Sequence, residues 1–273
     1  MKRSSRAEGL LRFLLLAFLP LAAQAGEQWN LLPVIPLFKP LIGDPREPQT
    51  SVMAYTSQAQ FEGAIGRKVD LLHWYPGDGT AWGWGILGAG YILLGQQGVA
   101  FPMRANDWYA GMYLSETTGA FSHRLEFVHQ SAHLGDSYEG SLEPMIYNGE
   151  YFSFATSFQP SENLRLYTGL GAWENHYPYG NAFFASFGTE LYSPSLDFGG
   201  TFLRGYATFD GHWKAEGAGA FDKTVQLGFQ WKMKKEQTRA FRLAVIYYNG
   251  LSEYGQFYLS PDEHWALGFY FDP

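Results

Sequence analysis

Residues 264–271 read His264-Trp-Ala-Leu-Gly-Phe-Tyr-Phe271, and every second side chain from Trp265 onward is large and apolar. Successive side chains of an extended strand point to opposite faces, so this alternation gives one apolar face and one face of smaller or polar residues. Residues 223–233 repeat the pattern, with Val225, Leu227, Phe229 and Trp231 on one side. Both stretches predict β-strands with one strongly apolar face.

Similar runs recur from Ser51 onward, separated by Gly, Pro, Asn or Asp. We expect strands at about 51–61, 66–74, 81–94, 107–115, 121–133, 145–158, 164–175, 182–192, 198–210, 223–233, 240–249 and 264–271. The run at 66–74 is the weakest, and it is included because bacterial single-chain barrels have even strand numbers. The pattern therefore predicts about twelve strands.

The links between these runs tend to alternate between short and long. Short links fall at 75–80 and 116–120, and longer ones at 95–106 and 134–144. Short turns at one end and long loops at the other are typical of outer-membrane barrels. The sequence thus predicts an all-β fold, a transmembrane antiparallel outer-membrane β-barrel over residues 50–273. A soluble sandwich or lipocalin-like barrel is the alternative, with its aromatic face turned inward.

The composition fits a barrel better than a soluble enzyme. Aromatic residues make up 18% of the chain and charged residues only 16%, and there are 32 glycines. The absence of cysteine excludes disulfides and thiolate chemistry. The formal net charge of -7 argues against a nucleic-acid partner. The expected partners are instead membrane lipids and the outer-membrane assembly machinery, and the oligomeric state is left open.

The N-terminus has the features of a secretory signal peptide over residues 1–25. A basic region at residues 2–6 precedes an apolar run at 13–23 and the small-x-small site Ala23-Gln24-Ala25. That run is shorter than the roughly 20 residues of a transmembrane helix. Residues 26–49 are rich in proline, which forbids a regular ladder, and we interpret them as a periplasmic lead-in segment. The expected location is the cell outer membrane of a Gram-negative bacterium.

Residues 121–133 form a predicted strand whose two faces differ. One face is mostly polar and is expected to line the lumen, and the other begins apolar and is expected to face lipid. Toward the outer rim, the lipid face carries His129 and Ser131, two residues apart and within reach of each other. His129 could then act as a base that takes the proton of Ser131.

The returning strand at 145–158 offers a third group. If Ser131 lies opposite Asn148, then His129 falls opposite Glu150. Asn148, or Glu150 in its place, would orient the imidazole and complete a catalytic triad. The simpler interpretation is that these side chains only meet lipid headgroups and water.

The link between these two strands is acidic. It contains Asp136, Glu139 and Glu143, whose oxygens could bind calcium if the protein is a hydrolase. A solvated loop is the favoured interpretation, and no other cofactor is expected.

A passive barrel is the other functional hypothesis, and it ranks slightly above the enzyme. The protein would then be a structural or envelope component, or a small-solute pore. Its lumen would be lined by Arg124, Glu126, Gln130, Tyr147, Tyr151, Gln226, Gln230 and Lys232. Because a barrel of about twelve strands is narrow, side chains of this size could fill it.

Three blocks resemble a bacterial domain-of-unknown-function family, DUF1207. They begin at Phe38-Lys-Pro-Leu, at His129-Gln-Ser-Ala-His-Leu-Gly-Asp and at Gly255-Gln-Phe-Tyr. That resemblance implies no settled activity.

The His129-Gln-Ser131 stretch with the downstream Asn148 also resembles outer-membrane phospholipase A and lipid A deacylases. This local resemblance implies a serine lipid esterase with a Ser–His–Asn or Ser–His–Glu triad on its lipid-facing wall, and calcium at the site in the phospholipase. Both families usually have Asn directly after the Ser, whereas this chain has Ala132.

Overall fold

The computed structural model describes residues 27–56, 58–136, 138, 140, 143–178, 182–215, 220–234 and 239–272. The predicted signal peptide lies outside these residues. The elements are β1 (Gln28–Leu31), β2 (Thr50–Tyr55), β3 (Gln60–Tyr75), β4 (Thr80–Gly95), β5 (Met103–Thr118), β6 (Phe121–Leu134), β7 (Tyr147–Ser161), β8 (Leu164–Tyr177), β9 (Phe183–Tyr192), β10 (Leu196–Phe198), β11 (Thr201–Lys214), β12 (Phe221–Lys232), β13 (Ala240–Leu251), the 3-10 turn η1 (Gly255–Phe257) and β14 (Pro261–Asp272). None of the described helical segments is long and apolar enough to cross a membrane.

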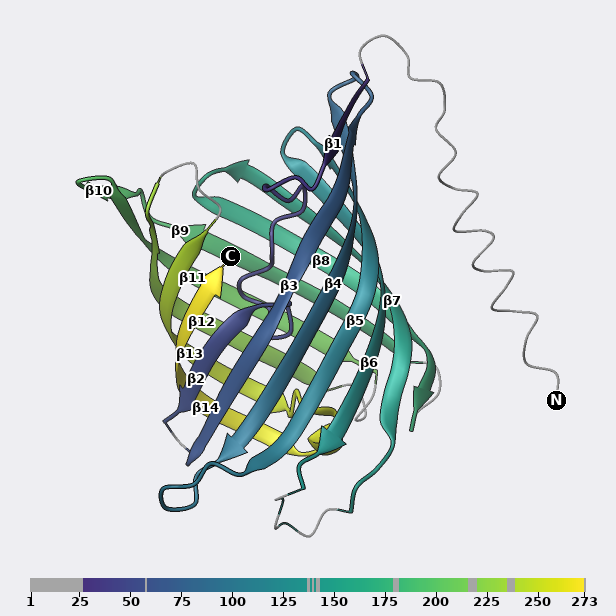
Figure 1. The fold of residues 1–273 in the computed structure, drawn as a ribbon, viewed down its shortest axis with the longest axis vertical. Coiled ribbons are helices and arrows are strands. Elements are labelled where there is room, and N and C mark those ends of the chain that lie inside the picture. The colour runs from purple at the N-terminus through teal and green to yellow at the C-terminus, as the bar shows by residue number, and fades with distance from the viewer. Residues whose placement is uncertain are drawn as a thin grey trace, which may run out of the picture.

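Twelve of these strands form an antiparallel ring, which the pairing of β14 with β2 closes (Figure 1). β1 and β10 belong to the same sheet but pair only with the last residues of β3 and the first residues of β11. Tight turns at 119–120 and 162–163 lie at one end of the ring, and the longer loops 96–102 and 135–146 at the other. The predicted all-β antiparallel barrel of about twelve strands is confirmed.

The first two strands differ from the expected ranges. The expected strand at 51–61 ends at Tyr55, and the weak candidate at 66–74 is part of a long strand that begins at Gln60. A register shift between Asp70 and Leu72 moves the side-chain alternation by one residue. This bulge explains why the period-two pattern is weak there.

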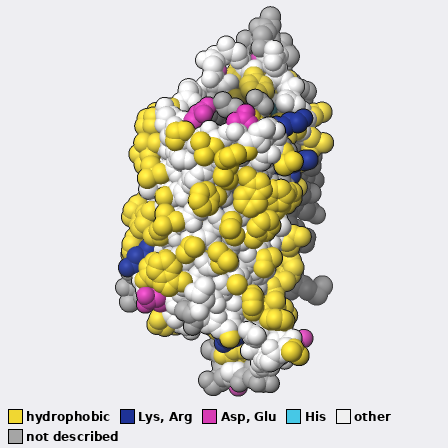
Figure 2. All heavy atoms as spheres, turned by 90° about the vertical axis from the view of Figure 1, so that its left-hand side faces the viewer, with side chains coloured by type: hydrophobic (Ala, Val, Ile, Leu, Met, Phe, Trp, Pro, Cys, Tyr) yellow, Lys and Arg dark blue, Asp and Glu magenta, His cyan; other side chains and the backbone are white. Residues whose placement is uncertain are grey.

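The outer surface of the ring is apolar. The exposed apolar side chains include Val52, Ile65, Ile86, Leu114, Leu125, Phe152, Phe154, Leu170, Phe187, Leu227, Phe229, Val245, Leu267 and Phe269. Figure 2 shows one side of the wall, where hydrophobic side chains cover the middle and charged side chains gather toward the two ends. Outward apolar residues that alternate with inward polar ones are the pattern of outer-membrane barrels, and the protein has that fold.

Residues 37–49, here called the plug segment, lie inside the ring (Figure 1). Prolines keep this segment out of the strand ladder, so its backbone groups need other partners. Arg165 of β8 donates hydrogen bonds of 2.7 Å to the carbonyls of Lys39 and Pro40, and the amide of Ile42 donates to Glu190. The lead-in segment at 26–49 was expected to contain no strand, but Gln28–Leu31 forms β1 and pairs with β3. The part that follows is irregular, and residues 37–49 fill the lumen.

Buried charges fix the plug segment to the wall. Arg124 of β6 holds Glu47 through two hydrogen bonds of 2.9 Å, and Lys68 of β3 lies 2.9 Å from the same carboxylate. Phe38 packs between the guanidinium groups of Arg124 and Arg165. The polar face predicted for β6 thus lines the lumen, where it binds this segment.

The loop at 252–260, here called the inner loop, folds into the lumen from the other end. Tyr254 donates a 2.6 Å hydrogen bond to Glu62, and the side-chain amide of Gln256 donates to the carbonyls of Ala132 and Met145. The ring therefore encloses chain from both of its ends.

Candidate functional site

The predicted catalytic residues lie together on the outer wall, near the end of the ring that carries the long loops. On β6, Arg124, Glu126 and Gln130 are buried, while the alternate residues are exposed or half-buried. His129 and Ser131 therefore face outward, as expected. Antiparallel pairing sets Ser131 opposite Asn148 and His129 opposite Glu150, which is the register on which the triad hypothesis depended.

His129 and Glu150 are in contact. The Nδ1 atom of His129 lies 3.0 Å from Oε1 of Glu150, and the two side chains are 48% and 37% exposed. With its proton on Nδ1, the imidazole donates to the carboxylate and leaves Nε2 for a second partner. Glu150, rather than Asn148, is thus the residue that contacts the ring of His129.

Ser131 makes no hydrogen bond to His129 among the described side chains. The two residues are alternate positions on one face of a strand, so their Cα atoms are about 6.5–7 Å apart and rotation of the side chains can bring them closer. Contacts between a nucleophile and its base are often long before substrate binds.

Two further residues at this place were missed from the sequence. Glu174 of β8 pairs with Glu150 across the next strand boundary, and Trp108 of β5 pairs with Ser131 on the other side. Trp108 is 48% exposed. Only the sheet register brings these two residues to the site, and their sequence positions carry no signal of it.

The acidic loop gives no support for a calcium site in its described part. Asp136 and Glu143 are exposed, and Glu139 lies outside the described residues. No grouping of metal-binding side chains is found there within the described part of the chain. Calcium binding by this loop stays a prediction.

The lumen contains a cavity of about 170 Å³ between the plug segment and the inner loop. One wall is aromatic and includes Tyr151, Trp173 and Phe184, whose rings pack against one another. The other wall is charged and includes Glu253 of the inner loop. Burial raises the pKa of Glu253, but Lys214 and Arg46 outweigh that effect and lower the pKa below its ordinary value.

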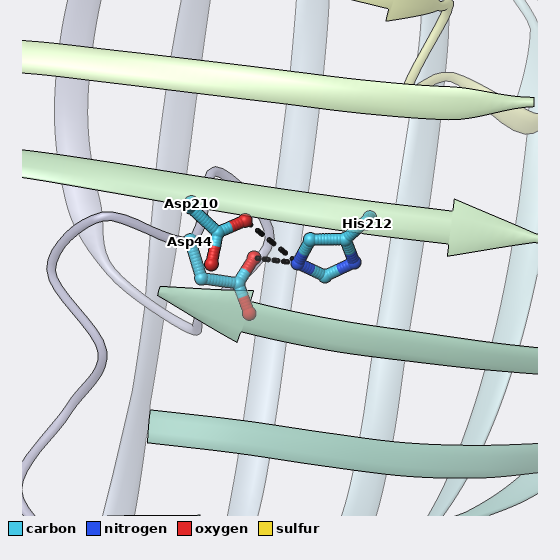
Figure 3. Close-up of side chains that lie close together, drawn as sticks. All are labelled: Asp44, Asp210 and His212. Carbon is cyan, nitrogen blue, oxygen red and sulfur yellow. Dashed lines mark ion pairs between the residues drawn. The ribbon is translucent and has the colours of Figure 1, made fainter. Parts of the chain in front are cut away.

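A second cluster lies at the charged wall, where the plug segment meets β11 (Figure 3). Nε2 of His212 is 2.8 Å from Oδ1 of Asp210 and 3.8 Å from Oδ1 of Asp44. Asp210 and His212 are alternate residues of β11, so both face inward. Sequence reasoning missed this cluster because nothing in the sequence places Asp44 inside the ring.

Comparison with solved structures finds similarity in shape to two bacterial barrels. The beta domain of the Bordetella autotransporter Brka has a TM-score of 0.47 and 12% identity, over 81% of this chain and 94% of that one. The outer-membrane protein OmpT of Vibrio cholerae has a TM-score of 0.37 and 11% identity, over 82% of this chain and 96% of that one. Both similarities are low, so the fold assignment rests on the strand pairing of this chain.

Among curated proteins no sequence matches. The model of one family, described as a protein of unknown function, matches residues 24–272, as the resemblance of the three sequence blocks predicted. The chain therefore belongs to the family DUF1207.

Proposed function

We propose that the protein resides in the outer membrane and hydrolyses lipid esters at a site on its outer wall. The observation that carries this proposal is the 3.0 Å contact between His129 and Glu150, on the face that also presents Ser131. A carboxylate on Nδ1 fixes the imidazole and directs Nε2 away from it, as the acid of a Ser–His–acid triad does.

The position of the cluster supports a lipid substrate. Polar and ionisable side chains that face lipid are costly, so their presence on an apolar wall calls for a reason. An ester in the outer leaflet cannot enter a lumen filled by the plug segment and the inner loop. A hydrolase that acts on it needs its nucleophile outside, where Ser131 lies.

The proposed chemistry is acyl transfer. Ser131 Oγ attacks the ester carbonyl while His129 Nε2 takes its proton, and His129 then donates that proton to the leaving alkoxide. Water attacks the acyl-enzyme, His129 again takes the proton, and the fatty acid leaves as Ser131 is restored. Asn148 lies opposite Ser131, and its amide N–H is the proposed donor to the oxyanion. It would do the work of the Asn that usually follows the Ser in the lipases that this stretch resembles, where this chain has Ala132.

A passive solute pore is less well supported. The plug segment and the inner loop occupy the lumen and leave an internal cavity, and the ion pairs of Glu47 hold the plug segment to the wall. The remaining alternative is a barrel with a structural role in the envelope, which would show no turnover in the assay below.

The test uses purified barrel in detergent micelles, with phospholipid and lipid A as substrates and with or without calcium. Ser131→Ala is expected to lower kcat on the order of 10³-fold or more, and Glu150→Gln by up to about 10⁴-fold, because the imidazole loses its orienting charge. Labelling by a fluorophosphonate should map to Ser131. Membranes of cells that carry Ser131→Ala should contain less lysophospholipid or deacylated lipid A.

Thr156→Ala is the matched control. Thr156 also faces outward and lies 3.0 Å from a histidine, His123, so its loss tests whether any hydroxyl beside an outer-wall imidazole matters. Turnover and labelling should be unchanged in this variant. Equal lipid profiles in wild-type and Ser131→Ala cells, with no label on Ser131, would remove the hydrolase and leave the structural barrel.

A further inference from the structure

The cluster of Asp44, Asp210 and His212 raises the question of what lies between these side chains. They come from two parts of the chain, the plug segment and β11, and they point toward one another (Figure 3). One oxygen of each carboxylate and one ring nitrogen all lie within 4.8 Å of one another. Ligands at about 2.0–2.2 Å from one ion are roughly 3–4 Å apart, so small side-chain movements would complete a coordination sphere.

Asp210 supplies an independent observation. The residue is 1% exposed, and its Oδ2 accepts a 2.6 Å hydrogen bond from Tyr167. Its Oδ1 lies 2.8 Å from Nε2 of His212, and neither of these two atoms has a hydrogen bond to any other side chain of the described residues. A carboxylate oxygen and an imidazole nitrogen that face only each other can both turn to a shared metal ion once the imidazole gives up its proton.

The charge balance points the same way. Two carboxylates and a protonated imidazole leave one negative charge, and a divalent cation that displaces the imidazole proton cancels both carboxylates. Within the described chain, His212 is the only basic side chain within ion-pair distance of either carboxylate. An uncompensated buried charge destabilises the fold strongly, whereas a coordinated one does not.

We propose that Asp44, Asp210 and His212 bind a divalent first-row metal ion, with Zn²⁺ as the probe. One imidazole and two carboxylates suit Zn²⁺ better than Ca²⁺, which takes six or more oxygens. Both carboxylates are held in place by hydrogen bonds, Asp210 through its other oxygen from Tyr167, and Asp44 by the backbone amide of Arg46 at 2.8 Å. The metal ties the plug segment to the wall.

The coordination sphere has an open side. Asp44 and His212 both line the lumen cavity of about 170 Å³, so a fourth ligand comes from the cavity, as water or as an oxygen of a small solute. Three protein ligands with one exchangeable position are the arrangement of catalytic zinc sites. This inference is independent of the outer-wall hydrolase, because no residue is shared.

The test is a titration of the purified full-length barrel, after treatment with a chelator, with Zn²⁺ and separately with Ca²⁺. Calorimetry should give one Zn²⁺ per chain, elemental analysis the same ratio after dialysis, and the midpoint of thermal unfolding should rise with Zn²⁺. Asp210→Asn and Asp44→Asn should each weaken Zn²⁺ binding about 100-fold or more, since even indirect partners of a metal change affinity 10–100-fold. Asp44 lies in an irregular segment, so Asp44→Asn retains the wall strands.

Asp262→Asn is the matched control. Asp262 lies 3.0 Å from the imidazole of His264, but within the described part of the chain it belongs to no group of three metal-binding side chains, so Zn²⁺ binding should match wild type. The proposal is overturned if wild-type barrel binds no Zn²⁺, or if Asp210→Asn and Asp44→Asn bind it as tightly as Asp262→Asn does. The cluster would then be an ion pair of a protonated His212.

Discussion

Removal of Glu47 should weaken the attachment of the plug segment to the wall. This carboxylate is 4% exposed and lies 2.9 Å from both Arg124 and Lys68, which are 3% and 8% exposed. Glu126, the other carboxylate of the group, lies 2.9 Å from both cations. Glu47→Ala leaves two buried cations with one carboxylate between them.

The magnitude follows from that imbalance. Removal of one member of a buried ion pair costs about 3–5 kcal/mol, because the remaining charge loses its partner without regaining water. A second change, Arg124→Met, restores the balance, because Lys68 and Glu126 then remain as one pair. The double variant should therefore be more stable than the sum of the two single changes implies, by roughly 1–3 kcal/mol.

Equilibrium unfolding in urea of barrel refolded into vesicles, followed by tryptophan fluorescence, measures these free energies. Glu162→Ala is the control, since Glu162 is exposed at a turn, and its effect should stay within about 0.5 kcal/mol. If Glu47→Ala behaves like this control, or if the single changes simply add, buried ion pairs do not hold the plug segment.

Four further outcomes are expected. Unboiled barrel should migrate differently from boiled barrel in an SDS gel, and identical mobility would contradict a closed ring. Phe269→Asp should reduce the amount of assembled protein in the membrane, because this side chain faces outward from β14. Gly255→Ala should destabilise the barrel by about 1–3 kcal/mol, since its Cβ would lie 2.4 Å from the ring of Tyr147, whereas Gly63→Ala meets nothing within 4 Å and should be neutral. Planar-bilayer recording of the wild-type barrel should show no conductance steps, and regular steps would mean that the plug segment leaves the lumen.

The wall of the barrel was predictable because the side chains of each strand alternate between the lipid face and the lumen face. Alternation in β6 and β7 gave the two faces, and the register that pairs His129 with Glu150 is one of those that this alternation allows. A shift by one residue would turn every apolar side chain to the wrong face, so few registers compete. This is why the sequence alone could place His129, Ser131, Asn148 and Glu150 on the same outward face.

The lumen was not predictable for the opposite reason. Prolines in the plug segment exclude a strand, but they do not say where an irregular segment lies. The partners of Glu47 are Arg124, which is distant in sequence, and Lys68, and no period links them. The blocks that begin at Phe38, His129 and Gly255 looked unrelated in the sequence, yet Gln256 binds the carbonyl of Ala132, and Arg46 stacks on Tyr254.

The two pairings of β3 limit how the interior can ever open. β1 pairs with β3 at Leu72–Tyr75, and β2 pairs with it at 60–64. The chain between β1 and β2, which contains the plug segment, is therefore attached to β3 at both of its ends. A segment attached at both ends cannot rotate out of the lumen about one of them. The whole segment can leave the lumen only if β1 or β2 separates from β3. β2 is held on both edges, because β14 also pairs with it, whereas β1 has β3 alone. The short strand Gln28–Leu31 is therefore the weaker of the two attachments to β3, and we expect its pairing to break first when the plug segment leaves the lumen.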